Sequence, residues 1–98
     1  MAYVIFSNKS TDGAVQASTD HTGGPLTVYV HVTDTNGSET IELGYLPATT
    51  NGSAAKYISI PRSDWESGMN FEFYGATEIY GRVGGADGST DLSMEYNA

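Results

Sequence analysis

Apolar and polar residues alternate in short stretches along the whole chain, which is the pattern of half-buried β-strands. The alternation is clearest over residues 25–33, where Leu26, Val28, Val30 and Val32 point one way and the residues between them the other. Successive side chains of a strand lie on opposite faces, so one face of this strand is predicted to be buried. Weaker alternation predicts further strands at residues 2–6, 13–18, 39–46, 55–60, 69–74, 77–83 and 90–96.

Turn-forming residues separate these stretches. The Asn-Gly pair at 36–37 is typical of a hairpin turn because both residues tolerate positive φ. The glycine-rich residues 84–89 predict a second hairpin, and residues 75–76 predict a tight connection between adjacent strands. Short strands at this spacing predict a single all-β domain, an antiparallel β-sandwich of seven to eight strands of immunoglobulin-like or jelly-roll type. The spacing leaves these two topologies open.

Residues 61–68 break the alternation. Ser63 and Glu66 have the spacing of a capping box, which predicts a single helical turn. The segment also carries Trp65, the only tryptophan of the chain. We expect this side chain either to plug the end of the sandwich or to be an exposed anchor for a partner, since Trp is enriched at interface hot spots.

The 98 residues are enough for one domain, and their composition argues against several classes of function. There are 12 acidic and 4 basic residues, and the net charge of −8 opposes nucleic-acid binding, because phosphate neutralisation needs clustered Lys and Arg. Without cysteine the chain has no disulfide and no thiolate metal site. No run approaches the ~20 apolar residues of a membrane span, and no signal peptide is recognisable. We therefore expect neither nucleic acid nor membrane as a partner.

Candidate catalytic groups are few. His21 and His31 are the only histidines, and no Gly-x-Ser-x-Gly motif accompanies them. Glu72 and Glu78 flank the connection at 75–76 and are predicted to lie on adjacent strands, where paired carboxylates could serve glycoside hydrolysis. Outward charges on a hairpin are nevertheless the ordinary pattern. We expect no enzyme activity and no cofactor.

Two turns carry oxygen atoms of the kind that calcium prefers. One turn holds Asp34 and Asn36, and the other holds Asp87 and Asp91. Neither completes an EF-hand pattern, and β-turns need Asp, Asn and Gly for backbone reasons alone. These four residues are weak calcium candidates, and no metal site is expected.

Tyr29, Tyr74 and Tyr80 each lie on the polar face of their predicted strand, where several charged residues also lie. If the strands are neighbours, the three rings form an aromatic and polar platform on which sugars stack. Otherwise they are structural or subunit-contact aromatics, because Tyr is favoured in strands generally. The platform predicts a carbohydrate-binding or tail-associated receptor-binding module as an alternative function.

The N-terminal residues 1–12 allow two interpretations. The stretch 2–6 is apolar and precedes a polar stretch rich in turn formers. It is either the first strand of the sandwich or part of an arm that pairs with an exposed sheet edge of a neighbouring subunit, leaving residues 13–98 as the sandwich. The partner-binding residues of such an arm are Tyr3, Val4, Ile5 and Phe6, with Trp65 as an additional anchor.

Three segments within residues 25–96 form a further pattern: a Val-rich strand (PLTVYVHV, 25–32), a strand with Leu-x-Tyr (ETIELGYL, 39–46), and a Gly-Ala-x-x-x-x-x-Arg-Val stretch (GATEIYGRVGG, 75–85) before a terminal strand. In this pattern, residues 25–96 resemble small tailed-phage virion proteins. The chain differs from that pattern in having no Trp within residues 47–54. The resemblance implies a capsid decoration or cement protein.

From this resemblance we expect a structural virion protein, made in the host cytoplasm, that binds the outer capsid surface and stabilises the shell. The implied partner is the major capsid protein, and the implied state is a homo-oligomer, either a dimer or a trimer. A position on the head or on the tail is left open by the sequence.

Overall fold

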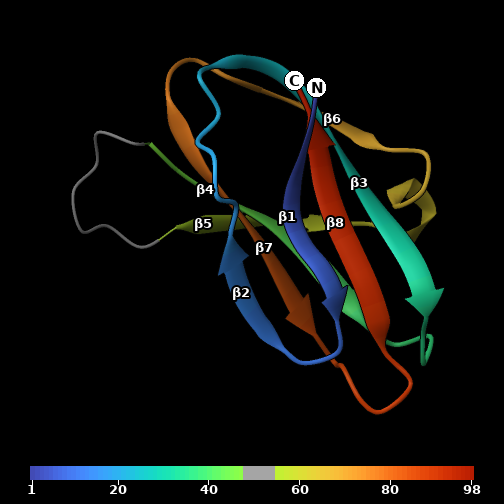
Figure 1. The fold of residues 1–98 in the computed structure, drawn as a ribbon. Helices are drawn as coiled ribbons and strands as arrows, with labels where there is room; N and C mark the ends of the chain where they lie inside the picture. The colour runs from blue at the N-terminus through green and yellow to red at the C-terminus, as the bar shows by residue number, and fades with distance from the viewer. Residues whose placement is uncertain (48–54) are drawn as a thin grey trace.

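Eight strands and one 3₁₀ helix make up the described residues of the computed structural model, which are 1–47 and 55–98 (Figure 1). The predicted strands are confirmed to within a few residues, and the largest difference is the first, which continues to Lys9. The elements are β1 (Ala2–Lys9), β2 (Gly13–Gln16), β3 (Gly24–Asp34), β4 (Thr40–Pro47), β5 (Lys56–Ile60), η1 (Arg62–Asp64), β6 (Met69–Phe73), β7 (Thr77–Gly84) and β8 (Asp91–Asn97).

The strands form two four-stranded antiparallel sheets. The first sheet has the order β1-β8-β3-β6, and the second sheet has the order β2-β7-β4-β5. The two sheets pack against each other around one core (Figure 1). The predicted antiparallel β-sandwich is therefore confirmed.

The strand pairs identify the topology as a jelly roll. Strand 1 pairs with 8, 2 with 7, 3 with 6 and 4 with 5, which is the ladder of one long hairpin wrapped into two sheets. Three predicted connections between neighbouring strands are wrong, because each one crosses from one sheet to the other. They are the hairpins at 36–37 and 84–89 and the tight connection at 75–76. Turn residues indicate where the chain reverses, but not which sheet the next strand joins.

The core consists of the alternate residues that face the space between the sheets. Leu92, Met94 and Tyr96 of β8 are fully buried, as their alternation predicts. Gly81 of β7 lies opposite them, and a Cβ atom there would be 2.5 Å from the Met94 sulfur and 2.8 Å from the Phe6 ring. The sheets thus approach each other too closely at this point for any side chain on β7.

The stretch at residues 2–6 is not a separate arm. As part of β1 it pairs with β8, and the ring of Tyr3 stacks on that of Tyr96 at 5.0 Å between centroids. Ile5 and Phe6 are buried in the core, while Val4 faces solvent and is 56% exposed. The arm interpretation of residues 1–12 is therefore wrong for this chain, because burying these apolar side chains in its own core keeps the segment in the sandwich.

The segment between β5 and β6 contains the predicted helical turn, η1, but not the predicted cap. Pro61 occupies the N-cap without a side-chain hydrogen bond, and the Glu66 carboxylate instead accepts the N–H of Val32 at 3.1 Å. Trp65 is 2% exposed and donates its indole N–H to the carbonyl of Ile60 at 3.0 Å. Trp65 therefore plugs the sandwich, and its interpretation as an exposed anchor is wrong.

Candidate functional site

The three tyrosines of the predicted platform do not come together. Tyr29 is on the outer face of the first sheet, and Tyr80 is on the outer face of the second sheet, on the opposite side of the molecule. The Tyr80 hydroxyl donates to Glu78 at 2.6 Å, and this bond together with burial raises the pKa of Tyr80 to about 12. Tyr74 follows the end of β6 and is 98% exposed. The single platform is therefore wrong, because its strands belong to two sheets.

The candidate catalytic residues are also dispersed. Glu72 and Glu78 lie on β6 and β7, which belong to different sheets, so the two carboxylates do not form a pair. His21 is buried, with Nε2 at 2.9 Å from the carbonyl oxygen of Gly24. His31 contacts carboxylates, and no hydroxyl of the described residues bonds either histidine.

Three of the four calcium candidates, Asp34, Asn36 and Asp87, accept hydrogen bonds from backbone N–H groups of their own turns, whereas Oδ1 of Asp91 is buried without a hydrogen-bond partner among the described residues. Asn36 Oδ1 accepts the N–H of Ser38 at 2.7 Å, and Asp87 Oδ1 accepts the N–H of Ser89 at 2.8 Å, which are the contacts of Asx turns. Asp34 and Asp91 are paired across β3 and β8. Within residues 1–47 and 55–98, no group of three or more metal-ligating side chains is placed to hold an ion.

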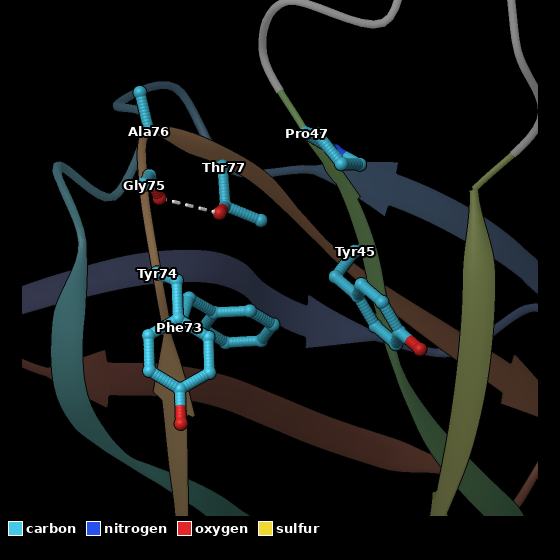
Figure 2. Close-up of a pocket in the computed structure, with 7 residues that line it drawn as sticks. All are labelled: Tyr45, Pro47, Phe73, Tyr74, Gly75, Ala76 and Thr77. Atoms are coloured by element: carbon cyan, nitrogen blue, oxygen red, sulfur yellow. Dashed lines mark hydrogen bonds between the residues drawn. The ribbon is translucent and has the colours of Figure 1, made fainter.

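One hollow does bring aromatic residues together, and we call it the end groove. It has a volume of about 370 Å³ and lies between the sheets where β4 and β6 end and β7 begins. Figure 2 shows Tyr45 on one side and Phe73 with Tyr74 on the other. Its lining residues are Tyr45, Pro47, Phe73, Tyr74, Gly75, Ala76 and Thr77.

The alternation of side chains along β4 and β6 directs two of these rings into the end groove. Tyr45 shares the inward parity of Leu43, and Phe73 is the last inward residue of β6, so both rings reach the open end of the sandwich. Their centroids are 5.5 Å apart. Tyr74, one residue later, turns outward and stands at the rim in solvent.

The floor of the end groove is held by the backbone. His21 and Thr77 exchange two backbone hydrogen bonds of 2.9 and 2.8 Å. Gly23, whose φ is +113°, packs so closely that a Cβ there would be 3.3 Å from the Cα of Gly75. The hydroxyl of Thr77 donates to the carbonyl of Gly75 at 2.8 Å (Figure 2). This bracing fixes the connection that carries Tyr74.

The chemistry of the end groove suits apolar contact. None of the described residues that line it carries a charge, and Thr77 already uses its hydroxyl proton within the protein. Small-molecule and peptide sites are typically apolar hollows with a few polar groups, and aromatic rings supply large contact areas. The end groove therefore fits an apolar or aromatic group of a partner.

The sequence contains part of this site. Tyr74 is singled out there as a member of the aromatic platform. What the sequence does not give is that β4 and β6 end at the same edge of the sandwich, since this follows from sheet topology.

No family model, curated protein or solved structure matches this chain. The resemblance of residues 25–96 to small tailed-phage virion proteins therefore stays a prediction. Among the residues that the structure describes, no helix has the length and apolar character needed to cross a membrane.

Proposed function

We propose that this protein is a structural capsid decoration, or cement, protein that binds the outer surface of a phage capsid without converting a substrate. The proposal assigns the end groove as the docking site for an apolar group of the major capsid protein. The observation that carries it is the exposure of Tyr74, 98%, at the rim of an uncharged aromatic hollow.

Exposed apolar side chains are rare in the described part of the chain. The large ones among the described residues are Met1, Val4 and Tyr74, and of these three Tyr74 lines the end groove. Tyr is enriched among the few interface residues that dominate binding, where truncation costs about 2 kcal/mol or more. Because the connection under Tyr74 is braced, little backbone freedom is lost when a partner covers the ring.

The net charge of −8 supports assembly on a different protein in preference to unspecific self-association. Like charges keep free copies apart in solution, while an acidic protein is attracted to a basic surface. When such a partner binds at the uncharged end groove, apolar area is buried and no charged group of the groove loses its water. A capsid surface with basic residues around an apolar projection is the matching partner.

The jelly roll is compatible with this proposal and with its alternative. Jelly rolls occur in viral capsid proteins and in lectins, so the topology by itself favours neither. The choice depends on the site.

The alternative is a carbohydrate-binding or tail-associated receptor-binding module, and one observation favours it. On the outer face of the second sheet, Arg82 lies 3.7 Å over the ring of Tyr57 and makes two 2.9 Å hydrogen bonds to Glu42. Tyr80 and Tyr57 flank Gly44 on the same face. Aromatic rings beside planar polar groups suit sugars, although here the polar groups already bond to each other.

The copy number per particle tests the proposed function. Intact particles from the source culture are purified on a density gradient, and this protein is quantified by mass spectrometry against the major capsid protein. Copies comparable in number to the capsid protein are expected. A few copies would place it on the tail and favour the alternative, and complete absence from particles would contradict both.

A glycan screen separates the two candidates further. We expect no glycan binding by the wild-type protein. Binding that is lost in Tyr80→Ala and kept in Tyr74→Ala would replace the proposed function by the alternative, because Tyr80 and Tyr74 lie on different surfaces.

A further inference from the structure

The edge of β3 is covered by two different kinds of neighbour. β6 pairs with β3 only from Gly24 to Val28. Beyond that point, residues 62–68 lie alongside: the N–H of Val30 donates to the carbonyl of Trp65 at 2.9 Å, and the N–H of Val32 donates to the Glu66 carboxylate at 3.1 Å. A side chain thus replaces the strand that would otherwise pair with β3 at Val32.

His31 holds that side chain in place. Its Nδ1 is 3.4 Å from Glu66 Oε2, and its Nε2 is 2.8 Å from Glu95 Oε1 on β8. The ring of Tyr29 stacks in parallel beside it, 6.3 Å away and inclined by 9°. The titratable groups in contact with His31 are therefore Glu95 from β8, Glu66 from residues 62–68, and Tyr29 from β3 itself.

Only a doubly protonated imidazole can donate to both carboxylates. The neutral ring has one N–H and presents a lone pair at the other nitrogen. The shorter bond, to Glu95, is the one expected to survive, so loss of the proton turns the 3.4 Å contact with Glu66 from attraction to repulsion.

We propose that His31 is a proton-controlled latch that holds residues 62–68 on the edge of β3 through Glu66. With the proton bound, Glu66 caps the N–H of Val32. Without the proton, Glu66 is released and the N–H of Val32 becomes free to pair with an added strand. Exposed sheet edges pair with added strands both in aggregation and in peptide binding.

The direction of the pH response follows from the contacts. The hydrogen bond to Glu95 raises the pKa of His31 above its ordinary value; partial burial opposes this, and Glu66 adds to it. A raised pKa means that the latch is fully closed below the ordinary histidine value of about 6.5 and opens as the pH rises through the raised value.

The same segment has other attachments that do not involve a histidine. Arg62, at the start of η1, bonds Glu39 at 3.2 Å, and Trp65 is buried in the core. Arginine stays charged at all ordinary pH values. The latch therefore frees the residues near Glu66 while the segment as a whole stays in place.

Hydrogen exchange by NMR tests the latch. The protection of the Val32 amide, corrected for intrinsic exchange, is compared at about pH 5.5 and about pH 8.5, on either side of the histidine range. We expect protection to fall about two- to five-fold at the higher pH, the size that a half-exposed ion pair allows. The amide of Val28, within the β3–β6 ladder, is the internal control and should not change.

The variant His31→Gln keeps a hydrogen-bond donor but cannot titrate, so its Val32 protection should be the same at both pH values. Unchanged Val32 protection in the wild-type protein, or the same pH step in His31→Gln, would overturn the proposal. A double-mutant cycle with Glu66→Gln, which keeps the acceptor for Val32, provides a second measurement. The coupling between residues 31 and 66 should be present at the lower pH and absent at the higher one, and equal coupling at both would contradict the latch.

Discussion

At one end of the sandwich Glu39 is a buried carboxylate surrounded by hydrogen-bond donors, whereas at the other end Tyr45 and Phe73 line an open groove. The two ends are the two ends of β4, which pairs with Gly84 of β7 at Thr40 and with the start of β7 at Pro47. Glu39 is 4% exposed and Tyr74, beside the end groove, is 98% exposed.

The closed end ties three connections together. The carboxylate of Glu39 accepts hydrogen bonds from the hydroxyl of Thr35, the N–H of Asn36 at 2.9 Å, the hydroxyl of Thr90 at 2.7 Å and the guanidinium of Arg62 at 3.2 Å. A buried charge is tolerated when donors surround it in this way. All of these polar groups are used inside the protein.

Among the residues that the structure describes, the open end has no such network of side-chain hydrogen bonds. Its aromatic side chains line an uncharged hollow, Tyr45 and Phe73 partly buried and Tyr74 in solvent, and the hydrogen bond of Thr77 there braces the backbone. The closed end therefore contributes stability, whereas the open end retains apolar area that is available for contact with a partner.

The largest expected effect is at the closed end. Glu39→Ala leaves the hydroxyls of Thr35 and Thr90 and the N–H of Asn36 without their acceptor and removes the ion pair with Arg62. We expect the free energy of unfolding to fall by about 3–5 kcal/mol. Chemical denaturation measures this. Glu72→Ala, at an exposed position on β6, is the matched control and should change stability by less than about 0.5 kcal/mol. Similar small losses for both variants would remove the distinction.

The backbone of the core gives the next largest effect. Gly81→Ala places a methyl group 2.5 Å from the Met94 sulfur, and we expect a loss of about 1–3 kcal/mol from overpacking. Gly75→Ala, at the end groove, meets no atom within 4 Å and should be nearly neutral. Thermal denaturation of both variants checks this, and equal melting temperatures would show that the core yields as easily as the open end.

Acid should weaken the closed end. Burial alone raises the pKa of Glu39, but the bonds from Thr35, Thr90 and Asn36 outweigh burial and hold it well below the ordinary value. The depressed pKa gives stability that is present above the ordinary glutamate value of about 4.3 and is lost as the pH falls towards the folded-state value. Stability of the wild-type protein should therefore fall more steeply on acidification than that of Glu39→Gln, and parallel curves would contradict the assignment.

The smallest effect on stability is expected at the open end. Tyr74→Ala removes a ring that is almost fully in solvent, so the free energy of unfolding should change by less than about 0.5 kcal/mol. Chemical denaturation tests this. A larger loss would mean that the ring contributes to the fold, and the variant would then be unsuitable for testing binding.

The positions of the strands and the buried face of each strand were predictable from the sequence. The order in which the strands pair in the two sheets was not. The alternation of Leu92, Met94 and Tyr96 identifies β8 and its buried face, because period two is a local property of the chain. The Asn-Gly pair at 36–37 marks a true reversal, yet it connects different sheets, which depends on pairing of distant strands.

The residues of the candidate site were likewise predictable one by one, but their arrangement in space was not. Tyr74 was identified as an exposed aromatic, while its neighbours in the predicted platform lie on other surfaces. The buried role of Glu39 was not visible either, because its donors come from residues 35, 36, 62 and 90. Contacts between distant segments decide both ends of the sandwich, and a pattern read along the chain does not contain them.

The most direct test of the end groove is an add-back experiment with particles that lack this protein. Purified wild-type protein, Tyr74→Ala and Val4→Ala are titrated onto the particles, and bound copies are counted by quantitative mass spectrometry. Val4 is the control because it is also an exposed apolar residue but lies on β1, at the opposite edge of the first sheet from β6. We predict saturable binding of the wild-type protein and of Val4→Ala, and at least about tenfold weaker binding of Tyr74→Ala, as expected for an interface hot spot. Equal binding of Tyr74→Ala and wild type would contradict the end groove as the docking site, and no binding of the wild-type protein would contradict the decoration function itself.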